Sequence, residues 1–285
     1  MIGLGLVGGS ITLAILRCLS GVRVVGYTHR PATRRRAREL AVATEIAEDM
    51  AESVSEADLV IIATPVCTFE ETFGAIADRL PAGCIVTDVG STKVLAQRWA
   101  TKRLPKTTHY VGSHPIAGSE QRGVEFARDD LFERTTCILT TTKRTNRKTV
   151  QILKRFWSSL GCSVRLMTPA EHDRILANVS HVPHLVAAAL TNASDSEELK
   201  LASTGFIDAS RVASGPANIW ADVLLTNANN TSKSIDKITA ELEKLRTAIR
   251  TQNKRQVEKL LEKARNKREA LIDYKIKKKE LTSRE

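Results

Sequence analysis

The sequence predicts an α/β domain built on a parallel sheet, followed by an all-α domain. Two observations support this prediction. Through the first 168 residues, short apolar runs alternate with helical patterns, which is typical of parallel strands joined by crossover helices. After Thr168-Pro169 no segment has the pattern of a strand. We therefore place a domain boundary near Thr168, which gives domains of residues 1–168 and 169–285.

The strands expected in the first domain are short apolar runs bounded by turn residues. They are Val22–Tyr27, Asp58–Thr64, Cys84–Val89, Tyr110–Ser113, Thr136–Thr142 and Ser163–Met167. The helices expected between them are Gly9–Leu19, Thr33–Leu40, Thr68–Leu80, Thr92–Lys102 and Asn146–Leu160. Prolines fall at the expected ends of these elements, where they break no ladder of hydrogen bonds. The first domain therefore alternates strand and helix.

The second domain is expected to hold a buried helix and a helical seam. Asp173–Leu190 is apolar nearly all round, which indicates a helix covered by its neighbours, and Pro183 should kink it. Further on, apolar residues recur at spacings of three and four, which predicts packing against another helix. The residues of this seam are Ile235, Ile238, Leu242, Leu245 and Ile249, then Val257, Leu260, Leu261 and Ala264.

The composition excludes several classes of protein. With 42% hydrophobic and 26% charged residues, the chain is typical of a soluble globular protein rather than a disordered one. No apolar run approaches the roughly 20 residues that span a bilayer. The five cysteines are widely spaced and contain no CxxC pair, so they indicate free thiols in the cytoplasm rather than disulfides or a zinc site.

The positive charge is concentrated near the end of the chain. The net charge is +11, and residues 231–285 hold 17 Lys and Arg against 9 Asp and Glu, a net of +8. Apart from Tyr274 this segment has no interleaved aromatic residues, and it matches no recognition motif for nucleic acid. A solvated helix face is the favoured interpretation, and nucleic acid is not expected as a partner.

The segment Gly3-Leu4-Gly5-Leu6-Val7-Gly8 matches the pattern G-x-G-x-x-G at the start of an expected helix. In this pattern the first glycine (Gly3) allows a tight turn, the second (Gly5) lets the backbone approach a pyrophosphate, and the third (Gly8) permits close packing. The sequence therefore predicts a Rossmann-type dinucleotide-binding domain. The residues expected to bind the cofactor are Gly3, Gly5, Leu6, Val7, Gly8, Thr28, His29, Arg30, Thr64 and Pro65.

The residues that should face the cofactor ribose favour NADP over NAD. An NAD enzyme normally carries Asp or Glu at the end of the second strand, for the ribose 2′-hydroxyl. Here Thr28, His29 and Arg30 occupy that position, and they could bind a 2′-phosphate. The arginines of the next helix, Arg35, Arg36 and Arg38, are expected to form a solvated face.

The first strand of such a domain is expected to be incomplete. A Rossmann-type domain begins with a buried strand of about five residues before the glycine turn. Only Met1 and Ile2 precede Gly3 in this sequence. We therefore expect the native protein to extend further upstream.

Polar clusters follow several expected strands, where the ligands of open α/β sheets bind. They are Thr64-Pro65, Asp88–Lys93 and Gly112–Glu120. Within them and in the second domain lie words that are specific in combination: HPIAG after Ser113, SHVPH around His181, and an FxDxxR segment that ends at Arg211. On these words the chain resembles prephenate and arogenate dehydrogenases. The similar segments are GLGLVGGS (Gly3–Ser10), TDVGSTK (Thr87–Lys93), SHPIAGSE (Ser113–Glu120), HDRILANVSHVPHLVAAAL (His172–Leu190) and GFIDASRVASGPANIWADVLLTN (Gly205–Asn227).

The resemblance implies an activity: the NAD(P)-dependent oxidative decarboxylation of prephenate to 4-hydroxyphenylpyruvate, on the route to tyrosine, with no metal. It implies that His114 binds the ring 4-hydroxyl and acts as the base while hydride leaves for the nicotinamide. It implies that Ser91 orients that hydroxyl and the imidazole.

The resemblance also implies how the substrate is held. Arg211 would clamp a carboxylate through two parallel hydrogen bonds, which lysine cannot reproduce. His181 would contact the side-chain end of the substrate. Glu120, Asp208 and Trp220 would shape the pocket and hold Arg211. The all-α domain would be a dimerisation domain, so we expect a homodimer that binds a small-molecule substrate and no membrane.

Each assignment has a plainer alternative. His114, before a proline at a strand end, could cap a turn, and Arg211 could form a structural ion pair with Asp208. Trp220, like Trp157, could be core packing. His181 and His184, three residues apart on one helix, could be metal ligands, but no third ligand has a suitable spacing. His184 is therefore expected to be a hydrogen-bonded core residue.

Three other functions remain as alternatives. The enzyme could act on arogenate, which carries an amine where prephenate has a keto group. A β-hydroxyacid dehydrogenase would carry a catalytic lysine on the long interdomain helix, and Asp173–Leu190 has none. A non-catalytic NADP-binding sensor would have no use for a base facing the nicotinamide.

Overall fold

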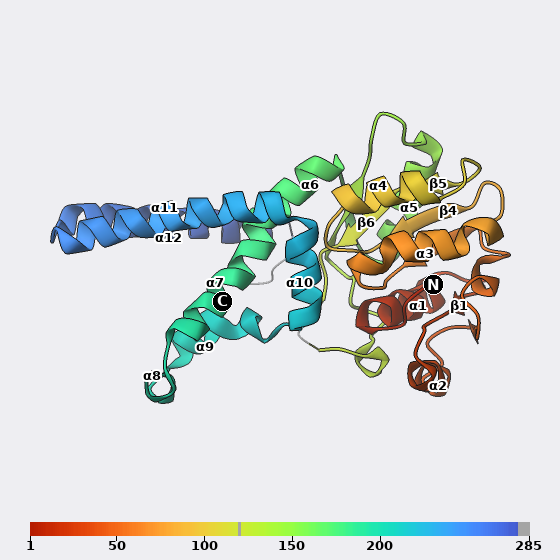
Figure 1. Cartoon of the computed structure of the whole chain (residues 1–285), viewed down its shortest axis with the longest axis horizontal. Coiled ribbons are helices and arrows are strands. Elements are labelled where there is room, and N and C mark those ends of the chain that lie inside the picture. Colours follow the sequence, from red (N-terminus) through yellow and green to blue (C-terminus); the bar gives the residue numbers. More distant parts are fainter. Residues whose placement is uncertain (119–120, 279–285) are drawn as a thin grey trace. The chain divides into compact units, whose positions relative to one another are not determined.

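The computed structural model of the chain describes residues 1–118 and 121–278 (Figure 1). It divides into two compact units, Met1–Ala228 and Asn229–Glu285. All strands in the described residues belong to the first unit. The boundary expected near Thr168 marks the change from strands and helices to helices alone within that unit. As a domain boundary it stays a prediction.

The strands form a parallel part and a mixed part. In the parallel part, β1 (Val25–Gly26) pairs with β2 (Glu45–Ile46), and β4 (Ile85–Asp88) lies between β3 (Leu59–Ile62) and β5 (His109–Tyr110). In the mixed part, β7 (Thr136–Thr140) pairs antiparallel with β6 (Gly112–Pro115) and parallel with β8 (Ser163–Met167). The carboxyl ends of β1, β3 and β4 therefore meet at one edge, where the sequence predicted the ligands.

Residues Met1–Gly3 occupy the place between β1 and β3. Ile2 forms parallel bridges to Tyr27 and to Ile62. Its N–H donates to the carbonyl of Ile61 at 2.9 Å, and the N–H of Gly3 donates to the carbonyl of Tyr27 at 2.8 Å. Ile2 is only 1% exposed. The residues before the glycine turn therefore lie at the place of the first strand, joined to both neighbours by isolated bridges.

Helices cover both faces of the sheet, as the buried apolar strands require. Val60 and Ile62 pack with α3 (Phe69–Ile76) and α4 (Val94–Arg103), whereas Ile61 packs with α1 (Leu6–Cys18) and α5 (Arg147–Ser159). Successive residues of a strand point to opposite faces, so one apolar run serves two cores. Trp157 is fully buried in the second of these cores, which agrees with its alternative as packing.

Three details of the strand predictions were wrong. The strand expected at Val22–Tyr27 begins only at Val25, and β2 was not predicted, because two residues are too short to show an alternating pattern. The single strand expected at Tyr110–Ser113 is divided between β5 and β6. The chain changes partner there, from β4 to β7, and this change depends on the tertiary fold.

The long helix expected at Asp173–Leu190 is interrupted. It consists of α6 (Pro169–Leu176), a π-helical segment (Ala177–His181) and α7 (Val182–Ala193). Pro183 has no N–H to donate, and the wider π turn lies directly before it. The irregularity predicted from Pro183 is therefore present, as a π turn inside the helix.

The remaining elements are helical. α2 (Pro31–Glu39) follows β1, and α8 (Ser196–Lys200), α9 (Thr204–Ser210) and α10 (Ala217–Thr226) complete the first unit. The second unit holds α12 (Lys254–Lys277) and α11 (Ala228–Arg250) except its first residue, and the chain reverses between the two helices at residues 251–253 (Figure 1). Within the described residues, none of the helices has the length and apolar character needed to cross a membrane.

Candidate active site

The glycine turn has the geometry of a phosphate site. Gly3 has φ of +95°, and a Cβ there would lie 2.7 Å from the backbone of Ala63; a Cβ on Gly8 would lie 1.9 Å from the carbonyl oxygen of Gly3. Neither position accepts another residue. A Cβ on Gly5 would meet nothing within 4 Å, so space is open beside the start of α1. The first intrahelical bond runs from the N–H of Gly9 to Gly5, which leaves the preceding N–H groups for an anion.

The residues expected at the ribose are held by an arginine that the sequence did not single out. Nη1 of Arg34 donates to the carbonyl of Thr28 at 2.7 Å and to that of His29 at 3.2 Å, and its Nε pairs with Glu48 at 2.9 Å. Thr28 is buried, whereas His29 and Arg30 are exposed. Arg34 therefore fixes the loop and leaves the side chains of His29 and Arg30 facing outward.

A buried ion pair holds the loop that follows β4. Nζ of Lys93 lies 2.5 Å from Oδ2 of Asp88 and donates to the carbonyl of Gly90 at 2.6 Å; both charged side chains are fully buried. The hydroxyl of Tyr110 donates to Oδ1 of Asp88 at 2.6 Å. Burial, together with the Asp88 carboxylate, raises the pKa of Tyr110 well above its usual value. These bonds fix the loop in which half-buried Ser91 lies.

His114, at the end of β6, is linked to two residues that sequence reasoning missed. Its Nδ1 lies 2.8 Å from Nε2 of His172, whose Nδ1 lies 2.7 Å from Oδ1 of Asp173. Oδ1 and Oδ2 of Asp173 accept the N–H groups of Lys93 and Val94 at the start of α4, at 2.8 and 2.9 Å. Ser91 forms no hydrogen bond with His114 among the described residues. The sequence signal for His172 and Asp173 was their place at the start of the similar segment His172–Leu190, in which neither of these two residues was assigned a role.

The imidazole of His114 is held in its neutral form. Burial lowers the pKa of His114 well below its usual value, and the nearby His172 and Lys93 lower it further. Burial also lowers the pKa of His172. A neutral imidazole can accept a proton from a hydroxyl, which is what a general base requires.

His181 presents an unpaired nitrogen in a buried setting. Asn227 donates from Nδ2 to the backbone carbonyl of Asp173 at 2.7 Å, and the same Nδ2 lies 3.3 Å from Nδ1 of His181. Nδ1 of His181 is therefore an acceptor, and Nε2 carries the hydrogen. Nε2 is buried and has no hydrogen-bond partner among the described residues, and burial lowers the pKa of His181 to about 4. A buried N–H without a partner costs about 1–3 kcal/mol, so this donor points to a ligand.

His184 and Trp220 pack against each other. Their rings are stacked, with centroids 3.7 Å apart and planes 9° from parallel. A Cβ on Gly215 would lie 2.4 Å from Nε1 of Trp220, so the backbone approaches this stack closely. In residues 1–118 and 121–278, no group of three or more His, Cys, Asp or Glu side chains could hold a metal ion. This stacked contact fits the alternative in which Trp220 is a packing residue.

The other expected substrate residues are exposed or lie outside the described residues. Asp208, on α9, and Arg211, directly after it, are both exposed. The clamping role of Arg211, the role of Asp208 in holding it, and the alternative ion pair between the two stay predictions. Glu120 lies outside the described residues.

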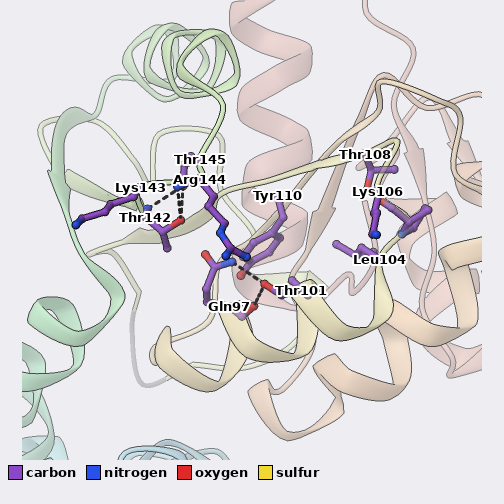
Figure 2. Close-up of a pocket in the computed structure, with 12 residues that line it drawn as sticks. Gln97, Thr101, Leu104, Lys106, Thr108, Tyr110, Thr142, Lys143, Arg144 and Thr145 are labelled. Atoms are coloured by element: carbon purple, nitrogen blue, oxygen red, sulfur yellow. Dashed lines mark hydrogen bonds between the residues drawn. The ribbon is translucent and has the colours of Figure 1, made fainter.

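A separate pocket of about 700 Å³ lies beside α4 and β5 (Figure 2). Lys106, Lys143 and Arg144 contribute positive charge to its lining, which contains no carboxylate. Thr142 and Thr145 hydrogen-bond to each other on one side, and Gln97 donates to Thr101 on the other (Figure 2). None of the residues expected at the active site lines this pocket.

Comparisons with known proteins agree with this arrangement. Residues 11–166 match the family model of the prephenate dehydrogenase nucleotide-binding domain, and residues 168–265 match that of the prephenate dehydrogenase dimerization domain. Prephenate dehydrogenase of Bacillus subtilis is 35% identical over 279 residues, which are 94% of this chain and 74% of that protein.

Solved structures show the same fold. Prephenate dehydrogenase from Aquifex aeolicus, in complex with hydroxyphenyl propionate and NAD+, has a TM-score of 0.89 and 32% identity, covering 95% of this chain and 96% of that one. Synechocystis arogenate dehydrogenase has a TM-score of 0.81 and 29% identity, covering 95% of this chain and 98% of that one. With its two family models matched in order over most of its length, the chain belongs to the prephenate dehydrogenase family.

Proposed function

We propose that the chain catalyses the oxidative decarboxylation of prephenate to 4-hydroxyphenylpyruvate, with His114 as the base. The observation that supports this most directly is the neutral imidazole of His114, which is hydrogen-bonded through Nδ1 and leaves Nε2 unbonded among the described residues. A base needs such a lone pair within reach of the substrate hydroxyl. A non-catalytic NADP-binding sensor would have no use for this free lone pair on His114.

The proposed oxidation and decarboxylation of prephenate need His114 as their single base. The substrate O–H bond breaks and its proton moves to Nε2 of His114, while the bound nicotinamide would accept the hydride from the same ring carbon. The ring carboxylate then leaves as CO2, and its electron pair completes the aromatic ring. The proton on His114 returns to the ring oxygen, which becomes the phenol. No net proton is released, and His114 ends in its starting form.

The donor on His181 favours prephenate over arogenate. In the proposed pose His181 contacts the side-chain end of the substrate, where prephenate has a keto oxygen and arogenate an ammonium group. Nε2–H of His181 can donate to an oxygen, whereas an ammonium would oppose it with another donor. Arg211 would clamp a substrate carboxylate, and Ser91, Trp220, Glu120 and Asp208 would border the substrate. Arogenate remains the second candidate.

For the cofactor, we propose a preference for NADP. The glycine turn and the start of α1 fit a dinucleotide phosphate, and no acid stands at the ribose position. His29 and Arg30 are exposed beside the loop that Arg34 fixes, so a 2′-phosphate could lie against them. Thr64 and Pro65, after β3, would border the cofactor. The relative from Aquifex aeolicus holds NAD+, so the preference must be measured.

We also propose that the chain forms a homodimer through its helical part. Residues of the expected seam on α11 stay open to solvent within the chain: Ile235 is 44% exposed, Leu242 60% and Ile249 63%. Apolar side chains at helical spacing need a partner to be buried. All five cysteines are free, which fits the proposed location in the cytoplasm.

One assay tests the proposal. Purified protein would be offered prephenate or arogenate, each with NADP or NAD, and the reduced nicotinamide followed by absorbance. We expect turnover with prephenate and NADP above the other three mixtures. His114→Ala should abolish turnover and leave cofactor affinity unchanged, with His109→Ala, a half-buried histidine on β5, as the matched control. Activity in none of the mixtures would refute the proposal in favour of the sensor.

A further inference from the structure

The proposed base is one end of a buried chain of hydrogen bonds that reaches the N-terminus of α4. The chain runs from Nδ1 of His114 to Nε2 of His172 at 2.8 Å, then from Nδ1 of His172 to Oδ1 of Asp173 at 2.7 Å. His172 is fully buried and Asp173 is 1% exposed. Water therefore does not compete for these bonds, and each is stronger than it would be at the surface.

The donors around Asp173 fix the positions of the protons. The N–H groups of Lys93 and Val94 donate to Oδ1 and Oδ2, so the carboxylate accepts on both sides. His172 must then carry its hydrogen on Nδ1 and donate it to Asp173. Burial lowers the pKa of His172, which keeps its imidazole neutral and leaves its Nε2 as an acceptor.

Only one tautomer of His114 completes this chain. Because Nε2 of His172 accepts, Nδ1 of His114 donates, and the lone pair of His114 lies on Nε2. In the opposite arrangement, with a hydrogen on Nε2 of His172, the His114 hydrogen would move to its own Nε2. That nitrogen could then accept no proton from a substrate. The direction of these hydrogen bonds therefore decides whether His114 can act as a base.

We propose that His172 and Asp173 are positioning residues that hold His114 in its Nδ1–H tautomer, an inference that rests on the proposed function of His114. Because both residues are buried, they would act on the reaction through His114 rather than by touching the substrate. When the O–H bond of the substrate breaks and the N–H bond forms at Nε2, the imidazolium keeps its Nδ1–H bond to His172. That bond becomes charge-assisted, and Asp173 stabilises the charge through His172. The reverse transfer restores the neutral pair.

The first test measures the tautomer without any substrate. The protein contains six histidines, so histidine labelled with nitrogen-15 gives few signals, and a His114→Gln spectrum identifies those of His114. Long-range proton–nitrogen correlations distinguish a protonated nitrogen from a bare one. We expect Nδ1 of His114 to be protonated and Nε2 bare near neutral pH. A protonated Nε2 would overturn the proposal, whether or not the protein turns over prephenate.

The second test separates positioning from structure. His172→Leu removes the acceptor, whereas His172→Gln places an amide oxygen near the former Nε2. We expect His172→Leu to lower kcat by about 100-fold, the scale of a general base, with KM for prephenate unchanged. His172→Gln should recover at least about 10-fold of that loss, and His109→Gln should match the parent protein. An unchanged cofactor affinity in each variant would show that its fold is intact. Equal losses in both His172 variants, or an effect on KM alone, would contradict the proposal.

Discussion

Removing one side of the buried pair of Lys93 and Asp88 should strongly destabilise the first unit. Lys93→Met removes the cation and leaves a fully buried carboxylate that still accepts from Tyr110 and Gly90. Breaking one side of a buried pair costs about 3–5 kcal/mol, because the remaining charge is left without its counterion. The double variant Asp88→Asn with Lys93→Met removes both charges. It should therefore regain at least half of the free energy of unfolding that Lys93→Met loses.

Urea unfolding of the whole chain, followed by circular dichroism, would measure these effects. The matched control is Lys244→Met, which removes one side of the exposed pair with Glu241; its midpoint should equal that of the parent protein. If Lys93→Met unfolds at the same urea concentration as Lys244→Met, the pair is solvated in solution. If the double variant is as unstable as Lys93→Met alone, the loss comes from packing rather than from the unpaired charge.

Three further predictions follow from the site. Gly8→Ala should destabilise the protein and abolish NADP binding, because its Cβ would lie 1.9 Å from the carbonyl oxygen of Gly3. Gly5→Ala should fold normally, because its Cβ would meet nothing within 4 Å, and it should bind NADP more weakly. Thermal melting measures the stability of the two variants, and calorimetric titration measures their affinity for NADP. Burial lowers the pKa of His114, His172, His181 and His184 in the folded protein. Below the ordinary histidine pKa of about 6.5, the unfolded chain therefore binds more protons than the folded chain does. The contribution of these four rings to stability should therefore be constant above that pH and fall between it and about 4, the pKa of His181. Urea midpoints that do not fall over this window would contradict the burial of these rings. Arg30→Ala should raise KM for NADP and leave KM for NAD unchanged, and a parallel rise in both would exclude a 2′-phosphate contact.

The sequence could predict those elements whose pattern is local. The apolar runs at Asp58–Thr64 and Cys84–Val89 became β3 and β4, and those at Thr136–Thr142 and Ser163–Met167 became β7 and β8. The switch of partner between β5 and β6 could not be predicted, because pairing depends on which strand lies alongside. A run of two residues such as β2 is below the length at which alternation can be recognised.

The candidate site shows the same limit. His114 could be found because it lies within a specific word, HPIAG. Its link to His172 joins residues 58 positions apart, and the direction of that link depends on the N–H groups at the start of α4. Lys93 could be placed in the polar cluster Asp88–Lys93, but its buried pairing with Asp88 depends on the tertiary fold. Residue type alone does not reveal such tertiary partners.

The π turn at Ala177–His181 gives the two halves of the interrupted helix separate rotational phases. A π turn is equivalent to one residue inserted into an α-helix, and each residue of an α-helix turns the chain by roughly 100°. Asp173 sets the phase of α6 through its bonds to α4, while His184, stacked on Trp220, sets the phase of α7. Deleting one residue between Ala177 and Ser180 would restore a regular helix with the same composition. It would also swing His184 about the axis, away from Trp220, so a length change of one residue would disrupt the site more than most substitutions in that segment.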